Sequence, residues 1–267
     1  MEAVEVGTLE VPGARLHYEV RGAGPPLLLI PGGNSDGVIF ERLAAVLAEE
    51  YRVVSYDPRG NSRSPLAGPP VDQRIEVHAE DAYRLLDHVG AAGEPARVFG
   101  SCSGGLVALE MTARRPERIR SVVVHEPPAL GLLPDAGEWA AFVRGVLAAY
   151  RRGGVAPAMR ELDALFGGRP APVLPEARDN TEFFLAHVLG PFTRYLPDVA
   201  ALARLDHPIA VAGGRDSRSL VVHRPAVVLA ERLGRDLVEF PGGHVGYVKW
   251  PEEFAGRLAE LLGGRRR

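Results

Sequence analysis

Hydrophobic and polar positions form two patterns along the N-terminal part of the chain, and these indicate strands followed by helices. Residues 26–30 are apolar without a break, which is the pattern of a strand buried on both faces. Residues 38–49 carry apolar side chains at helical spacing. A hairpin is expected at 11–20, around Pro12-Gly13. Further strands are expected at 52–56, 96–99, 119–125, 208–212 and 236–240. This alternation predicts an α/β fold, with a mostly parallel sheet flanked by helices.

The pattern changes between residues 127 and 204, where strand-like runs disappear. We therefore expect an α/β core formed by 1–126 and 205–267, with 127–204 as a helical cap. The natural place for such an insertion is over the carboxyl ends of the strands, where α/β sheets bind ligands. The cap helices are expected at 139–150, 156–166 and 181–195.

Composition narrows the class of protein. The chain has 267 residues, of which 46% are hydrophobic, and its formal net charge is −3. No basic field is present to attract nucleic acid. The chain opens without a signal-peptide pattern, and no apolar run approaches the roughly 20 residues of a membrane span. A single cysteine excludes an intramolecular disulfide. We expect a cytoplasmic protein with no membrane or nucleic-acid partner; no feature indicates an oligomeric state.

The segment around Cys102 has the pattern of a nucleophile turn. A sharp strand-to-helix turn that exposes a nucleophile needs small residues on either side, as in Gly-x-nucleophile-x-Gly. Gly100 and Gly104 flank Cys102 between an expected strand and an expected helix. The positive end of that helix favours the thiolate, which is the attacking form. The alternative is a small cysteine packed in a tight turn. The context and the partners described below favour the nucleophile.

These motifs resemble the α/β-hydrolase superfamily over nearly the whole chain outside the cap. Residues 30–33 are similar to its His-Gly oxyanion loop, 56–64 to its Asp-x-Arg-Gly-x-Gly-x-Ser loop, and 99–105 to its Gly-x-Ser-x-Gly-Gly turn. Two positions depart from the family pattern. Pro31 stands where histidine is frequent. Cys102 stands where serine is usual, as it does in dienelactone hydrolases and polyester synthases of the superfamily.

The resemblance implies a base and an acid that follow the nucleophile along the chain. His244, in a glycine-rich loop after the last expected strand, is the candidate base. Asp216, after the penultimate expected strand, is the favoured acid. Glu126, at the end of the preceding strand, competes for that role because some relatives carry the acid there. The resemblance thus implies a triad of Cys102, His244 and Asp216.

Backbone N–H groups are expected to hold the oxyanion. One belongs to Ser103 and the other to Gly33 or to Asn34. A phosphate loop is disfavoured because no Gly-Lys-Ser/Thr follows these glycines. Neither a metal cluster nor a dinucleotide fingerprint is visible, so no metal or cofactor is expected.

Aromatic residues recur in the cap at near-helical spacing. Most are expected to form the core of the cap, and a few to line the substrate pocket. Trp139, Phe142 and Phe184 are the candidates for the pocket, together with His125 at the end of a strand.

The leading hypothesis is hydrolysis of an ester, lactone or thioester through an acyl-Cys102 intermediate. The cap and its apolar content indicate a medium-sized, hydrophobic acyl substrate. A second hypothesis is an acyltransferase or cyclase, because an acyl-cysteine is a thioester that reacts readily with amines. A third is a catalytically idle protein of this fold that binds a small molecule. Epoxide and haloalkane hydrolysis are disfavoured because relatives use aspartate at the position of Cys102.

Overall fold

The computed structural model describes residues 4–91, 93–168 and 178–263. Within these residues, eight strands form one sheet in the order β1-β2-β4-β3-β5-β6-β7-β8. The strands are β1 Glu5–Val11, β2 Ala14–Arg21, β3 Pro26–Ile30, β4 Arg52–Tyr56, β5 Ala96–Ser101, β6 Ile119–His125, β7 Ile209–Gly214 and β8 Val238–Phe240. The pairs β1–β2 and β2–β4 are antiparallel, and all the others are parallel. The expected α/β-hydrolase fold, with its mostly parallel sheet, is confirmed.

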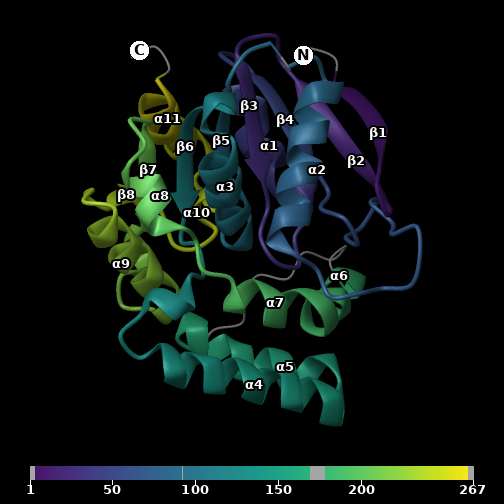
Figure 1. Ribbon diagram of the computed structural model, residues 1–267, viewed down its shortest axis with the longest axis vertical. Coiled ribbons are helices and arrows are strands. Elements are labelled where there is room, and N and C mark those ends of the chain that lie inside the picture. The colour runs from purple at the N-terminus through teal and green to yellow at the C-terminus, as the bar shows by residue number, and fades with distance from the viewer. Residues whose placement is uncertain (1–3, 92, 169–177, 264–267) are drawn as a thin grey trace.

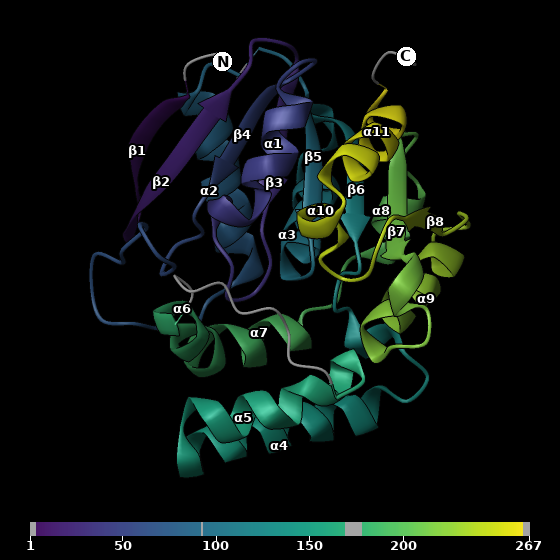
Figure 2. The same cartoon turned by 180° about the vertical axis from the view of Figure 1, so that it is seen from behind.

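The helices are α1 Glu41–Leu47, α2 Ile75–His88, α3 Ser103–Arg114, α4 Ala136–Gly153, α5 Val155–Leu162, α6 Arg178–Phe183, α7 Leu189–Arg194, α8 Val199–Ala203, α9 Arg224–Arg232, α10 Gly246–Lys249 and α11 Pro251–Leu262. Helices α2 and α3 cover one face of the sheet, and α1 and α11 cover the other (Figures 1 and 2). None of the helices in the described ranges is long and apolar enough to cross a bilayer.

Strand β3 shows why a continuous apolar run marks the centre of the sheet. Leu28 and Ile30 belong to the hydrophobic cluster under α2 and α3, whereas Leu27 and Leu29 belong to the cluster under α1 and α11. All four side chains are at most 1% exposed. Because successive side chains of a strand point to opposite faces, a strand covered on both sides has no polar positions.

The helices α4, α5, α6 and α7 form a separate layer beyond the carboxyl ends of the parallel strands (Figures 1 and 2). Apolar side chains of α4, α5, α7 and the π-helical turn Phe184–Val188 build a cluster of their own, which includes Val146, Ala158, Leu185 and Leu189. Helix α8 lies within 127–204 but packs against the core, since Leu202 belongs to the cluster under α2 and α3. Part of the expected cap, 169–177, lies outside the described residues.

Candidate active site

Cys102 occupies a sharp turn between β5 and α3. Its φ is +52°, in the left-handed region that side chains rarely adopt. A Cβ on Gly104 would lie 2.2 Å from the Ile30 carbonyl oxygen, and one on Gly32 would lie 2.5 Å from the Cys102 Cβ. The Cys102 N–H donates to the His125 carbonyl at 2.9 Å, which ties the turn to β6. The two glycines thus admit a strained turn that β6 holds in place.

His244 lies in the loop between β8 and α10, and its imidazole lies near enough to Cys102 for the two side chains to interact electrostatically. The side chain of His244 is 13% exposed. Its Nδ1 lies 2.7 Å from Glu126 Oε2. Cys102, His244 and Glu126 therefore lie together, and a hydrogen bond joins the last two.

The partner of His244 is Glu126 rather than the expected Asp216. Glu126 follows β6, which lies next to the β5 strand that ends at the nucleophile turn, and it is 1% exposed. Asp216 is exposed, and its backbone N–H donates to the Gly242 carbonyl at 3.0 Å. Among the described residues, Asp216 makes no side-chain hydrogen bond to His244. The longer glutamate side chain on the nearer strand reaches beneath the imidazole, so the second candidate of the sequence takes the position.

Four donors surround the Glu126 carboxylate. Oε1 accepts from the Gly214 N–H at 2.9 Å, from the Ser217 hydroxyl and from His223 Nδ1 at 3.1 Å, while Oε2 faces His244. Burial raises the pKa of Glu126, but the hydrogen bonds from His223 and His244 outweigh it and hold that pKa far below its ordinary range. Glu126 is therefore ionised at neutral pH.

Ser217 and His223 were not recognised from the sequence as members of this site. His223 lies near the start of a helix, where a histidine most often has a structural or surface role. The available signal was the glycine pair 213–214, because a Cβ on Gly213 would lie 2.4 Å from the His223 ring. That requirement becomes visible only once β7 and the residues before α9 are placed together.

The electrostatics of the two neighbouring histidines differ. Burial lowers the pKa of His244, but a thiolate at Cys102 and the Glu126 carboxylate outweigh it and raise the pKa to about 10. Burial lowers the pKa of His125 to about 4, with Glu126 opposing this change. The site thus favours an imidazolium at His244 and a neutral ring at His125.

The three expected oxyanion residues have different hydrogen-bond partners. Gly33 and Asn34 lie in the loop after β3, and Ser103 is the first residue of α3. The Gly33 N–H donates to Ser103 Oγ at 2.5 Å. The Ser103 N–H is in the first turn of α3, where helix N–H groups lack a carbonyl partner in the helix. The Asn34 side chain donates to Thr181 Oγ1 at 3.0 Å and so contacts the cap layer. An oxygen that replaces Ser103 Oγ would meet the N–H group of Gly33.

A cavity opens above Cys102 between the sheet edge and the cap layer. Its wall is apolar except for Thr193 and the residues at its base. The lining residues are Cys102, Ser103, Glu126, Pro128, Leu130, Val143, Leu162, Leu165, Phe166, Phe184, Leu189, Phe192, Thr193, Val222, Pro225 and His244. The ring of Phe166 lies 5.3 Å from the His244 ring, so the cap directly contacts the candidate base.

Of the four expected pocket residues, Phe184 lines this cavity. His125 is fully buried beneath the site, where its ring packs against Phe240 and Phe254. Its position at a strand end therefore places it under the site and not in the pocket.

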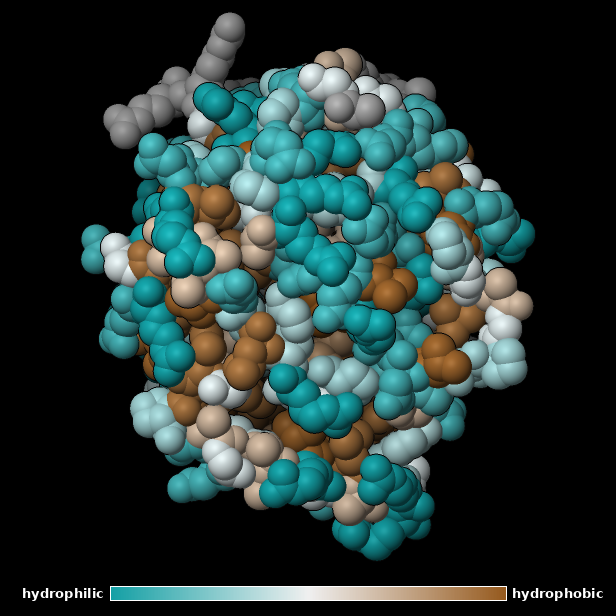
Figure 3. Space-filling view, in the orientation of Figure 1, coloured by the Kyte–Doolittle hydropathy of each residue, from teal (hydrophilic) through white to brown (hydrophobic). Residues whose placement is uncertain are grey.

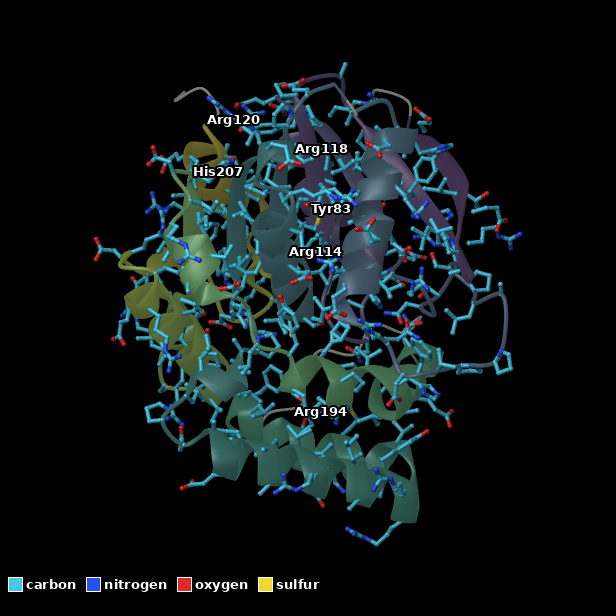
Figure 4. The ribbon with its side chains drawn as sticks, viewed as in Figure 1. Tyr83, Arg114, Arg118, Arg120, Arg194 and His207 are labelled. Carbon is cyan, nitrogen blue, oxygen red and sulfur yellow. The ribbon has the colours of Figure 1, made fainter. Side chains whose placement is uncertain are left out.

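Trp139 and Phe142 also lie away from this cavity, because the faces of α4 that carry them turn elsewhere. Their rings pack together at 5.6 Å. Trp139 borders a neighbouring groove between α4 and α7, which also contains Arg194 (Figure 4) and shares Leu130, Val143 and Thr193 with the cavity. In Figure 3, hydrophobic residues gather on the lower part of the visible surface, and hydrophilic residues border them. Helical spacing alone did not indicate which groove each aromatic ring would enter.

Within the described part of the chain, no group of three or more His, Cys, Asp or Glu side chains has an arrangement suited to a metal ion.

Comparisons with known proteins give the family of the chain. A family model described as the alpha/beta hydrolase fold matches residues 25–170. The chain is 38% identical over 262 residues to the uncharacterized hydrolase YraK of Bacillus subtilis (strain 168), covering 96% of this chain and 95% of that protein. It is 28% identical over 263 residues to a zearalenone hydrolase of Cladophialophora bantiana, covering 93% and 92%.

A solved structure shares the fold across the whole chain. A thermophilic esterase from Thermogutta terrifontis superposes with a TM-score of 0.76 at 23% identity, covering 97% of each chain. Since the family model spans more than half of the chain and YraK matches it almost from end to end, this chain belongs to the α/β-hydrolase fold family.

Proposed function

We propose that this protein hydrolyses an ester, lactone or thioester of a hydrophobic acyl group through an acyl-Cys102 intermediate. The observation that carries the proposal is the hydrogen bond between His244 and Glu126 beside Cys102, at the base of an apolar cavity. The chain is a hydrolase-fold protein whose named relatives are hydrolases. In this proposal Cys102 is the nucleophile, His244 the base and Glu126 the acid.

In the first half of the reaction, the Cys102 thiolate attacks the carbonyl carbon and forms a carbon–sulfur bond. The carbonyl electrons move to oxygen, and they return as the bond to the leaving group breaks. Protonated His244 gives its proton to the departing oxygen or sulfur. Glu126 stabilises the positive imidazole and keeps its Nδ1 as the donor, so that the other nitrogen faces Cys102.

In the second half, neutral His244 takes a proton from water, and the hydroxyl oxygen attacks the acyl carbon. The carbon–sulfur bond breaks, the free acid leaves, and Cys102 and His244 return to the thiolate–imidazolium pair. The oxyanion of each step would accept from the N–H groups of Ser103 and Gly33 after replacing the Ser103 hydroxyl. A donor of this kind contributes about 3 kcal/mol in comparable sites.

The cavity wall supports a hydrophobic acyl group as the substrate. Its side chains come from the cap and from the segment before α9, and Thr193 is their polar exception. Polar groups of a substrate would lose their hydrogen bonds to water there without gaining new ones, whereas an alkyl or aryl group would lose contact with water favourably.

Intact mass spectrometry after brief exposure to p-nitrophenyl butyrate tests this proposal. The wild type is expected to gain one butyryl group at Cys102 and to release butyrate. Cys102→Ala is expected to gain no mass and to lose at least about 1,000-fold in kcat/KM, with an unchanged circular dichroism spectrum. Turnover retained by Cys102→Ala would overturn the mechanism. A wild type that labels but transfers the acyl group only to added amines would indicate an acyltransferase, and no labelling at all would indicate a binding protein.

A further inference from the structure

His223 is a buried imidazole that the mechanism above does not use. It is 5% exposed and lies directly before α9. Its Nδ1 is 3.1 Å from Glu126 Oε1, on the carboxylate whose other oxygen faces His244. Two imidazoles, one from the last loop of the core and one from the segment before α9, therefore share a single carboxylate.

The division of donors between the two carboxylate oxygens has a consequence for orientation. A glutamate carboxyl group turns readily about its last bond, because that torsion is broad. Three donors on Oε1, from Gly214, Ser217 and His223, oppose this rotation. Since Oε1 is held, Oε2 remains aimed at His244 Nδ1. The donors on one oxygen thereby set the position of the other.

His223 donates its hydrogen bond to Glu126 from Nδ1. An ionised Glu126 has no proton to give, so Nδ1 must carry the hydrogen of this bond.

The segment that carries His223 also borders the acyl cavity. Val222 immediately before it and Pro225 two residues after it both line the cavity above Cys102. Gly213 of β7 supplies the space for the ring, since a Cβ there would lie 2.4 Å from it. The ring is thus packed between the sheet and the pocket wall.

We propose that His223 is a positioning residue of the hydrolytic site, which acts by holding the Glu126 carboxylate so that Oε2 faces His244. This inference rests on the proposed function, because it requires His244 to move protons for Cys102. His223 itself touches neither Cys102 nor the cavity contents: its effect passes through Glu126.

Two amide substitutions separate this role from simple packing. His223→Asn places an N–H donor near the original Nδ1, whereas His223→Gln places it about one bond further out. Both are polar and similar in size. With p-nitrophenyl butyrate, we expect His223→Gln to lower kcat about 10-fold with KM within two-fold. We expect His223→Asn to stay within about three-fold of the wild type.

A double-mutant cycle with Glu126→Gln shows whether the effect passes through the carboxylate. His223→Gln is expected to lower kcat by less than two-fold in the Glu126→Gln background, because the group that it positions is already lost. An equal loss in both backgrounds would overturn the proposal, as would equal kcat values for the Asn and Gln variants. Thermal unfolding of each variant gives the folded fraction by which kcat is normalised.

The same preparations distinguish this inference from the function on which it rests. If wild-type Cys102 takes up no butyryl group and the wild type releases no p-nitrophenol, the proposed function fails. If wild-type Cys102 is acylated and His223→Gln turns over at the wild-type rate, the proposed function stands and the role of His223 alone is rejected.

Discussion

Two parts of the active site are built in contrasting ways. One is its base, meaning the polar floor of the cavity and not the general base His244, and the other is the apolar wall. The base consists of Cys102, Glu126 and His244, which stand on turns that follow strands. Backbone hydrogen bonds link these turns: the Cys102 N–H donates to His125 at 2.9 Å, and the Glu126 N–H donates to Ala212 at 2.9 Å. The wall consists of apolar side chains from several helices. The base therefore depends on directional bonds, and the wall on shape and volume.

The wall also belongs to the hydrophobic core of the cap. Val143, Leu162 and Leu189 both line the cavity and belong to the cap cluster. Packing tolerates exchanges of similar volume, whereas a hydrogen-bonded chain fails when one atom changes its role. Substitutions in the base should therefore change the rate of hydrolysis, and substitutions in the wall should change which substrate is preferred.

The largest effect should separate the two carboxylates that compete for the acid role. In Glu126→Gln, the donors on Oε1 retain the amide oxygen, so the amide nitrogen faces His244. His244 must then accept at Nδ1, and its other nitrogen carries a proton and no longer serves as a base. We expect kcat/KM for p-nitrophenyl butyrate to fall on the order of 100-fold.

Asp216→Asn is the matched control, because it makes the same change on an exposed carboxylate. Its kcat/KM is expected to stay within two-fold of the wild type. The opposite ranking of the two variants would restore Asp216 as the acid and contradict the geometry of the base.

An intermediate effect concerns His125, which is buried beneath the site, and the free energy of unfolding as pH falls. The pKa of His125 is about 4 against an ordinary value of 6.5. Between these values the unfolded chain binds a proton that the folded protein excludes, so stability falls as pH drops through this window. At pH 5 the loss from His125 is about 2 kcal/mol relative to pH 8.

Urea unfolding at pH 8 and pH 5 measures this difference. His125→Phe keeps an aromatic ring among Phe240 and Phe254 and removes the titration. We expect the free energy of unfolding of this variant to fall by about 2 kcal/mol less than that of the wild type over the same interval. Parallel losses in both proteins would show that His125 does not carry the effect.

The smallest effect should come from the wall. Phe184→Ala removes an aromatic ring that lines the cavity next to Gly33. We expect the ratio of kcat/KM for p-nitrophenyl octanoate over p-nitrophenyl acetate to rise about five-fold, because the enlarged cavity accommodates a longer chain. Trp139→Phe, which alters the neighbouring groove, should leave the ratio unchanged. A shift in Trp139→Phe alone would place the acyl group in that groove.

Local patterns in the sequence determined the framework and the sharp turn that carries Cys102. The apolar run at 26–30, the strand–helix alternation and the glycines around Cys102 each depend on neighbouring residues, and neighbouring residues are what periodicity and turn chemistry report. The position of His244 followed from its loop after the last strand. These features required no knowledge of which strands lie side by side.

Tertiary structure alone decided which side chains meet. Glu126 and Asp216 both follow strands, and only the proximity of β6 to the nucleophile turn, together with the greater reach of glutamate, selects the first. His223 joins the carboxylate because Gly213 leaves room for its ring. Phe184 and Trp139 have the same apolar character but enter different grooves. Contacts between residues far apart in the chain depend on packing in three dimensions, which short-range patterns do not encode.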